Sequence, residues 1–150
     1  DLLSAFSKLE FDLHTTDFVL EELYNEQKLS ILELCNNKLT VIETAEASDY
    51  QGITSILGNS TGLSFEACSV WYYSKKMSGI LLTGDGKLRD QARSDNIEVH
   101  GIIYLFDMFL EQKVISPQEG IEKIKQLKLL NDRLPTIEID KRIKLWDENR

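Results

Sequence analysis

The order of apolar and polar residues along the chain shows two periods, one typical of helices and one typical of strands. Apolar residues recur every three to four positions in several segments, which predicts amphipathic helices, and short apolar or alternating runs between them predict strands. In chain order we expect helix 2–9, strand 11–16, helix 17–24, a helix from residue 30, strand 39–43, helix 50–57, helix 64–77, strand 80–83, helix 87–94, strand 97–99 and two further helices.

Local signals define some of the boundaries. Asp17 is a suitable N-cap for the helix after the first strand, and Ser30 is suitable for the start of the next helix. The run Gly-Asn-Ser-Thr-Gly at 58–62 predicts a loop. Ser116-Pro117-Gln118-Glu119 predicts a helix start with a capping box and proline at the first helical position.

The alternation of strands and helices predicts an α/β domain with a central, mostly parallel sheet. The apolar run Ile80-Leu81-Leu82 predicts a buried strand of that sheet. Segment 134–150 contains Pro135 and then apolar residues at helical spacing, which predicts a C-terminal arm or helix. We therefore place the main domain at residues 1–130 and the arm at 131–150.

Composition narrows the class of protein. A length of 150 residues favours one domain, and 42% hydrophobic with 28% charged residues favours a packed core and excludes a disordered chain. The sequence contains no run of about 18 apolar residues and does not open with a signal peptide. Cys35 and Cys68 lie in apolar surroundings, so we expect both to be reduced, in a cytoplasmic protein.

The net charge of −8 argues against a protein that coats nucleic acid through charge alone. The charge is unevenly distributed, because residues 1–72 carry 12 acids against three lysines, whereas residues 73–150 carry 13 acids against 14 bases. The acid excess of the first part fits either a solvated surface or a group of carboxylates that needs a cation.

Three acids are expected near one edge of the sheet. Sites in parallel α/β sheets gather at the carboxyl ends of the strands. Asp85 directly follows a strand between two glycines, and Glu66 lies in the first turn of the preceding helix. Glu21 and Glu22 lie on the helix after the first strand, where two neighbouring residues cannot both face one point. Each acid alone is more typical of a helix terminus, a turn or a solvated face. Together they suit a cation, because neighbouring carboxylates repel each other and their oxygens favour Mg²⁺ or Mn²⁺.

Other chemistries find less support. Zinc is disfavoured because His14 and His100 are the only histidines and both cysteines are expected to be buried. The sequence lacks a Gly-x-Ser-x-Gly elbow, a P-loop and a Gly-x-Gly-x-x-Gly motif, which argues against a nucleophilic triad or a nucleotide cofactor. Five basic residues near Asp85 could hold RNA phosphates or only solvate helix ends: Lys75, Lys76, Lys87, Arg89 and Arg93.

Three segments taken together resemble the PIN domain, a family that includes the VapC-type ribonuclease toxins of toxin–antitoxin pairs. They are Val-Leu-Glu-Glu-Leu at 19–23, Leu-Ser-Phe-Glu-Ala at 63–67 and Leu-Leu-Thr-Gly-Asp at 81–85. Leu88, Arg89 and Ala92, followed by Val-His-Gly at 99–101, are similar to a PIN branch in which the third acid is glutamate. The resemblance covers most of residues 1–116.

The resemblance implies a three-layer α/β/α fold and a Mg²⁺- or Mn²⁺-dependent endoribonuclease. It gives Glu22, Glu66 and Asp85 catalytic and metal-binding positions, Thr83 the position of a supporting hydroxyl, and Asp90 a weaker supporting position. It implies RNA as the substrate. A cognate antitoxin protein and a second copy of the chain are the candidate protein partners.

The sequence departs from the family pattern at its start. The family opens with a central strand that carries an aspartate ligand, and Asp1-Leu2-Leu3 does not match this motif. Loss of a central parallel strand would leave backbone groups of both neighbouring strands unpaired. We therefore expect such a strand to precede these 150 residues.

Two other function classes stay open at this point. A non-catalytic binding module on the same scaffold would use Trp71-Tyr72-Tyr73 and the amphipathic end around Trp146 as contact surfaces, although Trp71 is more simply explained as core. A flavodoxin-like receiver ranks lower, because neither an acid pair after the first strand nor a lysine ending a later strand is evident. Metal binding separates the enzyme from the binding module.

Overall fold

The computed structural model describes residues 2–34 and 38–149, which form two compact units. One unit, here called the strand-bearing unit, contains residues 11–100, and the other, the helical unit, contains residues 1–10 and 101–150. Cys35, which the sequence places in the core, lies outside the described residues.

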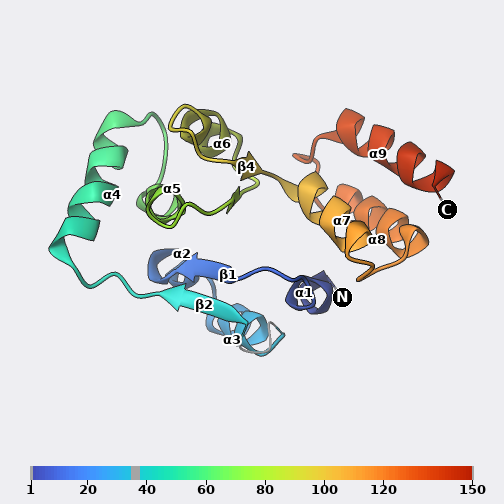
Figure 1. The fold of residues 1–150 in the computed structure, drawn as a ribbon, viewed down its shortest axis with the longest axis horizontal. Helices are drawn as coiled ribbons and strands as arrows, with labels where there is room; N and C mark the ends of the chain where they lie inside the picture. Colours follow the sequence, from blue (N-terminus) through green and yellow to red (C-terminus); the bar gives the residue numbers. More distant parts are fainter. Residues whose placement is uncertain (1, 35–37, 150) are drawn as a thin grey trace. The chain divides into compact units, whose positions relative to one another are not determined.

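The strand-bearing unit alternates short strands with helices (Figure 1). Its strands pair in parallel, which confirms the predicted α/β class. Its elements are β1 (Leu13–Thr16), α2 (Asp17–Glu21), α3 (Asn25–Leu34), β2 (Leu39–Ile42), α4 (Ala47–Asn59), α5 (Phe65–Lys76), β3 (Leu81–Leu82), α6 (Gly86–Arg93) and β4 (Val99–His100).

The described strands form two separate sheets of two strands each. β1 pairs with β2 from Leu13 opposite Leu39 to Thr16 opposite Ile42. β3 pairs with β4, with Leu81 opposite Val99. β1 and β3 are not hydrogen-bonded to each other, although α5 packs against both of them. The single sheet predicted from the sequence is therefore divided between β1 and β3 in the described residues.

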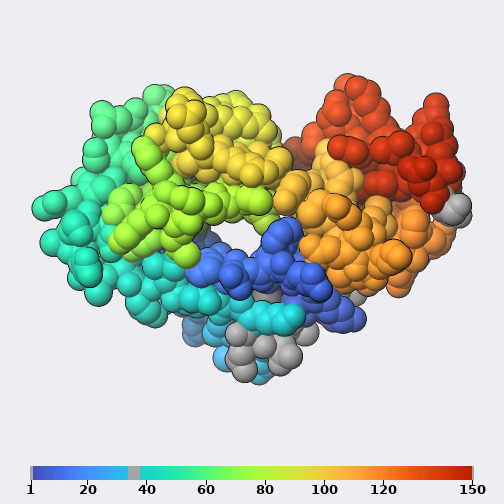
Figure 2. Space-filling view, in the orientation of Figure 1, coloured from blue at the N-terminus to red at the C-terminus, as the bar shows by residue number. Residues whose placement is uncertain are grey.

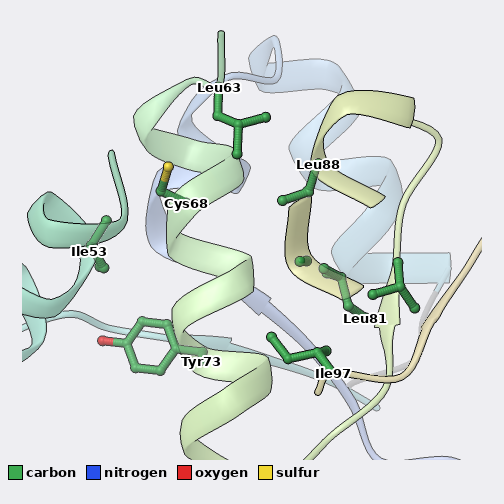
Figure 3. Close-up of a cluster of buried hydrophobic side chains, with 9 residues drawn as sticks. Ile53, Leu63, Cys68, Tyr73, Leu81, Leu88 and Ile97 are labelled. Atoms are coloured by element: carbon green, nitrogen blue, oxygen red, sulfur yellow. The ribbon is translucent and has the colours of Figure 1, made fainter. Parts of the chain in front are cut away.

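Helix α5 passes through the middle of the main hydrophobic cluster of this unit, as Figure 3 shows. Cys68 and Tyr73 on α5 are buried, as are Ile53 of α4 on one side and Leu88 of α6 and Leu81 of β3 on the other. This arrangement explains the apolar stripe of α5, and Cys68 is a free, buried thiol as predicted. Helix α5 packs against α2 in addition to the two helices named above.

Two helix starts differ from the sequence prediction. Thr16, and not Asp17, is the N-cap of α2, because its Oγ1 accepts the Val19 backbone N–H at 3.2 Å. The Asp17 carboxylate instead accepts the backbone N–H and hydroxyl of Thr44, at 3.0 and 3.3 Å. Both residue types cap helices well, so the local sequence did not distinguish them.

Helix α3 begins at Asn25, five residues before the predicted start at Ser30. The reason is a turn that forms ahead of the helix. The Tyr24 backbone N–H donates to the Gln27 side chain at 3.1 Å, and the Tyr24 carbonyl accepts the Lys28 N–H at 3.0 Å. These bonds satisfy backbone groups that a helix start leaves without partners.

The prediction that Ile80-Leu81-Leu82 is wholly buried was wrong for two of its three residues. Leu81 is 4% exposed, whereas Ile80 is 40% and Leu82 37% exposed. Successive strand residues point to opposite faces, and only the face that carries Leu81 belongs to the cluster around α5.

The helical unit consists of α1 (Leu2–Ser7), α7 (Ile102–Glu111), α8 (Pro117–Leu130) and α9 (Thr136–Glu148). The predicted capping box at Ser116 is present at the start of α8. Helices α8 and α9 pack side by side, as the orange and red atoms of Figure 2 show. Trp146 of α9 is buried and donates to Asp107 Oδ1 of α7 at 3.2 Å, so α9 is an integral part of this unit.

The domain boundary suggested at residue 130 falls inside the helical unit, at the end of α8. Within the described part of the chain, none of the helices combines the length and the apolar character that crossing a membrane would require.

Candidate functional site

The carboxyl groups of Glu22 and Glu66 come together from two packed helices of the strand-bearing unit. Glu22 is the C-cap residue of α2, and Glu66 lies in the first turn of α5. Helix α5 starts at this point because the hydroxyl of its N-cap, Ser64, accepts the Ala67 backbone N–H at 3.1 Å. The two acids are 44 positions apart in the sequence, so their meeting results from the packing of α2 on α5.

The proximity of the two carboxyl groups changes the acidity of Glu22. Partial burial raises the pKa of Glu22, and the charge of Glu66 and a side-chain hydrogen bond to Glu66 raise it further. Glu22 is an exposed residue, so water weakens these effects. A cation bound between the two groups would remove their repulsion, which makes the pair suitable for a metal ion.

Asp85 lies at the predicted place after β3, where it is the N-cap of α6. Its Oδ1 accepts the backbone N–H groups of Lys87 and Leu88, at 2.9 and 3.3 Å. The Asp85 backbone N–H in turn donates to Thr83 Oγ1 at 3.0 Å. The Thr83 hydroxyl thus holds the turn that carries Asp85, while Asp85 Oδ2 takes no part in the cap.

A divalent metal fits the Glu22–Glu66 pair by the chemistry of its donor atoms. Carboxylate oxygens are ligands that Mg²⁺ and Mn²⁺ favour, and Mg²⁺ is often held by one or two carboxylates together with water and substrate phosphates. Among the described residues, no three His, Cys, Asp or Glu side chains are grouped closely enough to hold a metal ion. Asp85 therefore does not join Glu22 and Glu66 in one three-acid cluster in this structure.

The remaining predicted acid and the nearby thiol are placed differently. Asp90 is exposed on α6, which is the placement of a solvated helix residue. Burial raises the pKa of the Cys68 thiol, a hydrogen bond to Ser60 lowers it, and the charge of Glu66 raises it. A buried thiol with a raised pKa is a poor nucleophile, so Cys68 packs the core beside the acid pair rather than reacting.

Two of the five predicted RNA-binding bases lie far from the acid pair. Lys75 and Lys76 are at the C-terminal end of α5. Lys76 follows Glu66 by ten residues, which corresponds to about 15 Å along the helix. Lys76 forms an ion pair with Asp49 at 2.7 Å, and Lys75 forms one with Asp95 at 2.6 Å.

The other three bases, Lys87, Arg89 and Arg93, share helix α6, which Asp85 caps. Arg93 donates a long hydrogen bond of 3.5 Å to the Val99 carbonyl, and Lys87 is exposed. The basic residues closest in sequence to a predicted acid are therefore on the first turns of α6.

A buried hydroxyl pair next to the acids was not found from the sequence. Thr16 Oγ1 and Ser69 Oγ lie 2.8 Å apart, and both residues are at most 1% exposed. Thr16 could have been recognised as a helix cap, but no local signal connects it with a serine 53 positions away.

The model of a family described as "PIN domain" (DUF3368) matches residues 1–148 of the chain. No curated protein and no solved structure matches the chain.

Proposed function

The chain belongs to the PIN-domain family, and on that premise we propose that it is a Mg²⁺- or Mn²⁺-dependent endoribonuclease in which Glu22 and Glu66 hold the metal. PIN domains are typically metal-dependent nucleases. The observation that carries the proposal is the pairing of these two carboxyl groups from separate helices, at the positions that the sequence analysis had assigned to metal-binding acids.

In this proposal the acidic side chains bind the metal and the basic side chains of α6 bind the RNA. Glu22 and Glu66 would hold the cation through their carboxylate oxygens. Asp85 lies outside this pair at the N-terminus of α6, where Oδ2 would offer a further carboxylate oxygen to water or substrate bound at the metal. A bound divalent cation would supply Lewis-acid activation of water and of the scissile phosphate. Lys87, Arg89 and Arg93 supply positive charge on α6 that attracts the phosphates flanking the cleaved bond.

The experiment measures cleavage of a labelled, mixed-sequence RNA with added Mn²⁺ by the unaltered chain and by Glu22→Gln and Glu66→Gln. We expect cleavage to fall to background in both variants. Glu21→Gln is the matched control, because Glu21 adjoins Glu22 in sequence but pairs with Lys28 at 3.1 Å instead of with Glu66. Equal cleavage by Glu66→Gln and Glu21→Gln would refute the assignment.

The proposal extends to a role as the toxin of a toxin–antitoxin pair, with a cognate antitoxin and a second copy of the chain as protein partners. Its support is the resemblance of three segments, at 19–23, 63–67 and 81–85, to the PIN domain, a family that includes the VapC-type toxins. Co-expression with the product of an adjacent small gene tests this role, since growth inhibition by the chain alone and its relief by the second product are expected.

The non-catalytic binding module is the competing function, and the grouping of only two acids in the described residues favours it. The RNA assay distinguishes the two functions. A chain that binds RNA equally well with and without Mn²⁺, and never cleaves it, would be a binding module.

The proposed domain organisation includes a further strand between β1 and β3. Helix α5 packs against both strands, and a helix is about 10 Å wide, whereas paired strands lie about 4.8 Å apart. The width of one helix is thus enough to cover β1, β3 and one strand between them, and the edges of β1 and β3 that do not face β2 and β4 would pair with that strand.

A further inference from the structure

The two helices that carry Glu22 and Glu66 are joined by a buried hydrogen bond between hydroxyl groups. Thr16 Oγ1 lies 2.8 Å from Ser69 Oγ. Thr16 is 1% exposed and Ser69 is 0% exposed, so water does not compete for these groups. Since a buried hydroxyl without partners is costly, the pair is a specific contact that fixes where α2 meets α5.

The direction of each hydrogen bond follows from counting protons. Ser69 Oγ lies 2.6 Å from the Glu66 carbonyl, which can only accept, so the single Ser69 hydroxyl proton is donated there. The Thr16 hydroxyl must then donate to Ser69 Oγ. Thr16 Oγ1 also accepts the Val19 backbone N–H at 3.2 Å. The bonds form one continuous chain from the Val19 amide through Thr16 and Ser69 to the Glu66 carbonyl.

Each of the two hydroxyl groups lies close in the chain to one of the two acids. Thr16 is the N-cap of α2 and Glu22 its C-cap, with the five residues of α2 between them, and the Glu22 backbone N–H donates to the Val19 carbonyl at 3.2 Å. Ser69 lies three residues after Glu66, on the same face of α5. Displacement of either hydroxyl would therefore move a carboxyl-bearing residue with it.

An aromatic contact between the two helices defines their register less closely. Phe18 and Phe65 pack edge to face, with ring centroids 4.8 Å apart. Edge-to-face ring pairs form over centroid separations of about 4.5–7 Å, so this contact tolerates small shifts of one helix along the other. A hydrogen bond loses strength steeply when its geometry changes.

We infer that Thr16 and Ser69 are positioning residues, which set the separation of the Glu22 and Glu66 carboxyl groups and so the affinity of the pair for a divalent cation. The involvement of a cation rests on the proposed function, whereas the positioning rests on the contacts alone. Neither hydroxyl contacts the cation or the RNA.

The test measures Mn²⁺ binding to the full chain by titration calorimetry for Ser69→Ala and Thr16→Val. Removal of a group that orients metal ligands typically weakens binding by about 10-fold or more, and we expect this for both variants. Thr16→Ser keeps the hydroxyl and should restore the affinity. Ser74→Ala is the matched control, because Ser74 Oγ makes the same kind of bond to a carbonyl of α5, that of Val70 at 2.7 Å, without a partner on α2.

A second measurement keeps the inference testable without a metal. The coupling between Glu22→Gln and Glu66→Gln is obtained from a double-mutant cycle of urea unfolding, in the unaltered chain and in the Ser69→Ala background. We expect a coupling in the unaltered chain that shrinks toward zero in the Ser69→Ala background.

The outcomes separate the two ideas. If the unaltered chain binds no Mn²⁺ but the coupling depends on Ser69, the proposed function fails and the positioning stands. If Ser69→Ala changes neither the Glu22–Glu66 coupling nor the Mn²⁺ affinity by more than the control Ser74→Ala does, the positioning inference is overturned.

Discussion

The Asp49 carboxylate and the Lys76 ammonium lie 2.7 Å apart and join α4 to α5 at the end of α5 opposite Glu66. Asp49 Oδ1 also accepts the Tyr72 hydroxyl at 2.6 Å, and Asp49 is 7% exposed. Lys76 lies over the rings of Tyr72 and Tyr73, at 6.0 Å from each centroid. A residue predicted to bind RNA is thus engaged in holding two helices together.

This ion pair predicts a loss of stability in acid. Hydrogen bonds from Lys76 and then Tyr72 lower the pKa of Asp49 from its ordinary value of 3.8. A lowered folded-state pKa contributes stability above the ordinary value, and this contribution is lost as the pH falls through the lower, folded-state value. Urea midpoints measured from neutral pH down to about pH 2 should therefore fall more steeply for the unaltered chain than for Asp49→Asn.

At neutral pH, where the ion pair is intact, Asp49→Asn should be the less stable of the two proteins, and the difference should shrink in acid. Identical acid profiles for the two proteins would show that the Asp49–Lys76 pair does not act on stability.

Gly52 of α4 is required by the close approach of Tyr72. A Cβ atom at this position would lie 2.2 Å from Tyr72 Cε2, and the Tyr72 ring is held by its bond to Asp49. We expect Gly52→Ala to lower the free energy of unfolding by about 1–3 kcal/mol, as overpacking does. Thermal or urea unfolding measures this change.

Gly58, in the same helix, provides the control. No atom lies within 4 Å of a Cβ built there, so Gly58→Ala should raise stability by about 0.5–1 kcal/mol through its effect on backbone entropy. If both alanine variants changed stability in the same direction, Tyr72 would not pack against Gly52 as closely as this structure places it.

Asp85→Asn separates the structural role of Asp85 from its proposed chemical role. Asparagine keeps the Oδ1 acceptor that binds the Lys87 and Leu88 amides, and it is as good an N-cap as aspartate. Stability should therefore change by less than about 0.5 kcal/mol. RNA cleavage should be lost and Mn²⁺ binding weakened, because the negative charge that Asp85 adds beside the Glu22–Glu66 pair is removed.

Unfolding followed by circular dichroism measures the stability of Asp85→Asn, and titration calorimetry on the same sample measures its Mn²⁺ binding. Full cleavage by Asp85→Asn would leave Asp85 with its capping role alone. Asp85→Ala, which removes the cap as well, should cost about 1 kcal/mol more in stability.

The proposed strand between β1 and β3 predicts a change in amide hydrogen exchange. In residues 1–150 alone, amides of β1 and β3 that do not face β2 and β4 should exchange fast. In a polypeptide extended by upstream residues that supply the strand, these amides should be protected by at least about 10-fold. Unchanged exchange in β1 and β3 after the extension would contradict the placement of the strand.

The sequence determined the elements, because the signals for them are local. Apolar spacing located α5, and the capping box at residues 116–119 located the start of α8. Where two adjacent residues could both cap, as Thr16 and Asp17 can, the local signal was ambiguous and the prediction was wrong. Burial was also mispredicted for Ile80 and Leu82, because an apolar run does not reveal which face of a strand is covered.

The acids Glu22, Glu66 and Asp85 were selected from the sequence by their positions near helix starts and strand ends, and by resemblance to one family. Only the tertiary structure decided that Glu22 and Glu66 meet, that Asp85 does not join them in a three-acid group, and that Thr16 bonds to Ser69. These relationships depend on the packing of α2 on α5. Such packing is set by side chains distant in sequence, so no local pattern of residues encodes it.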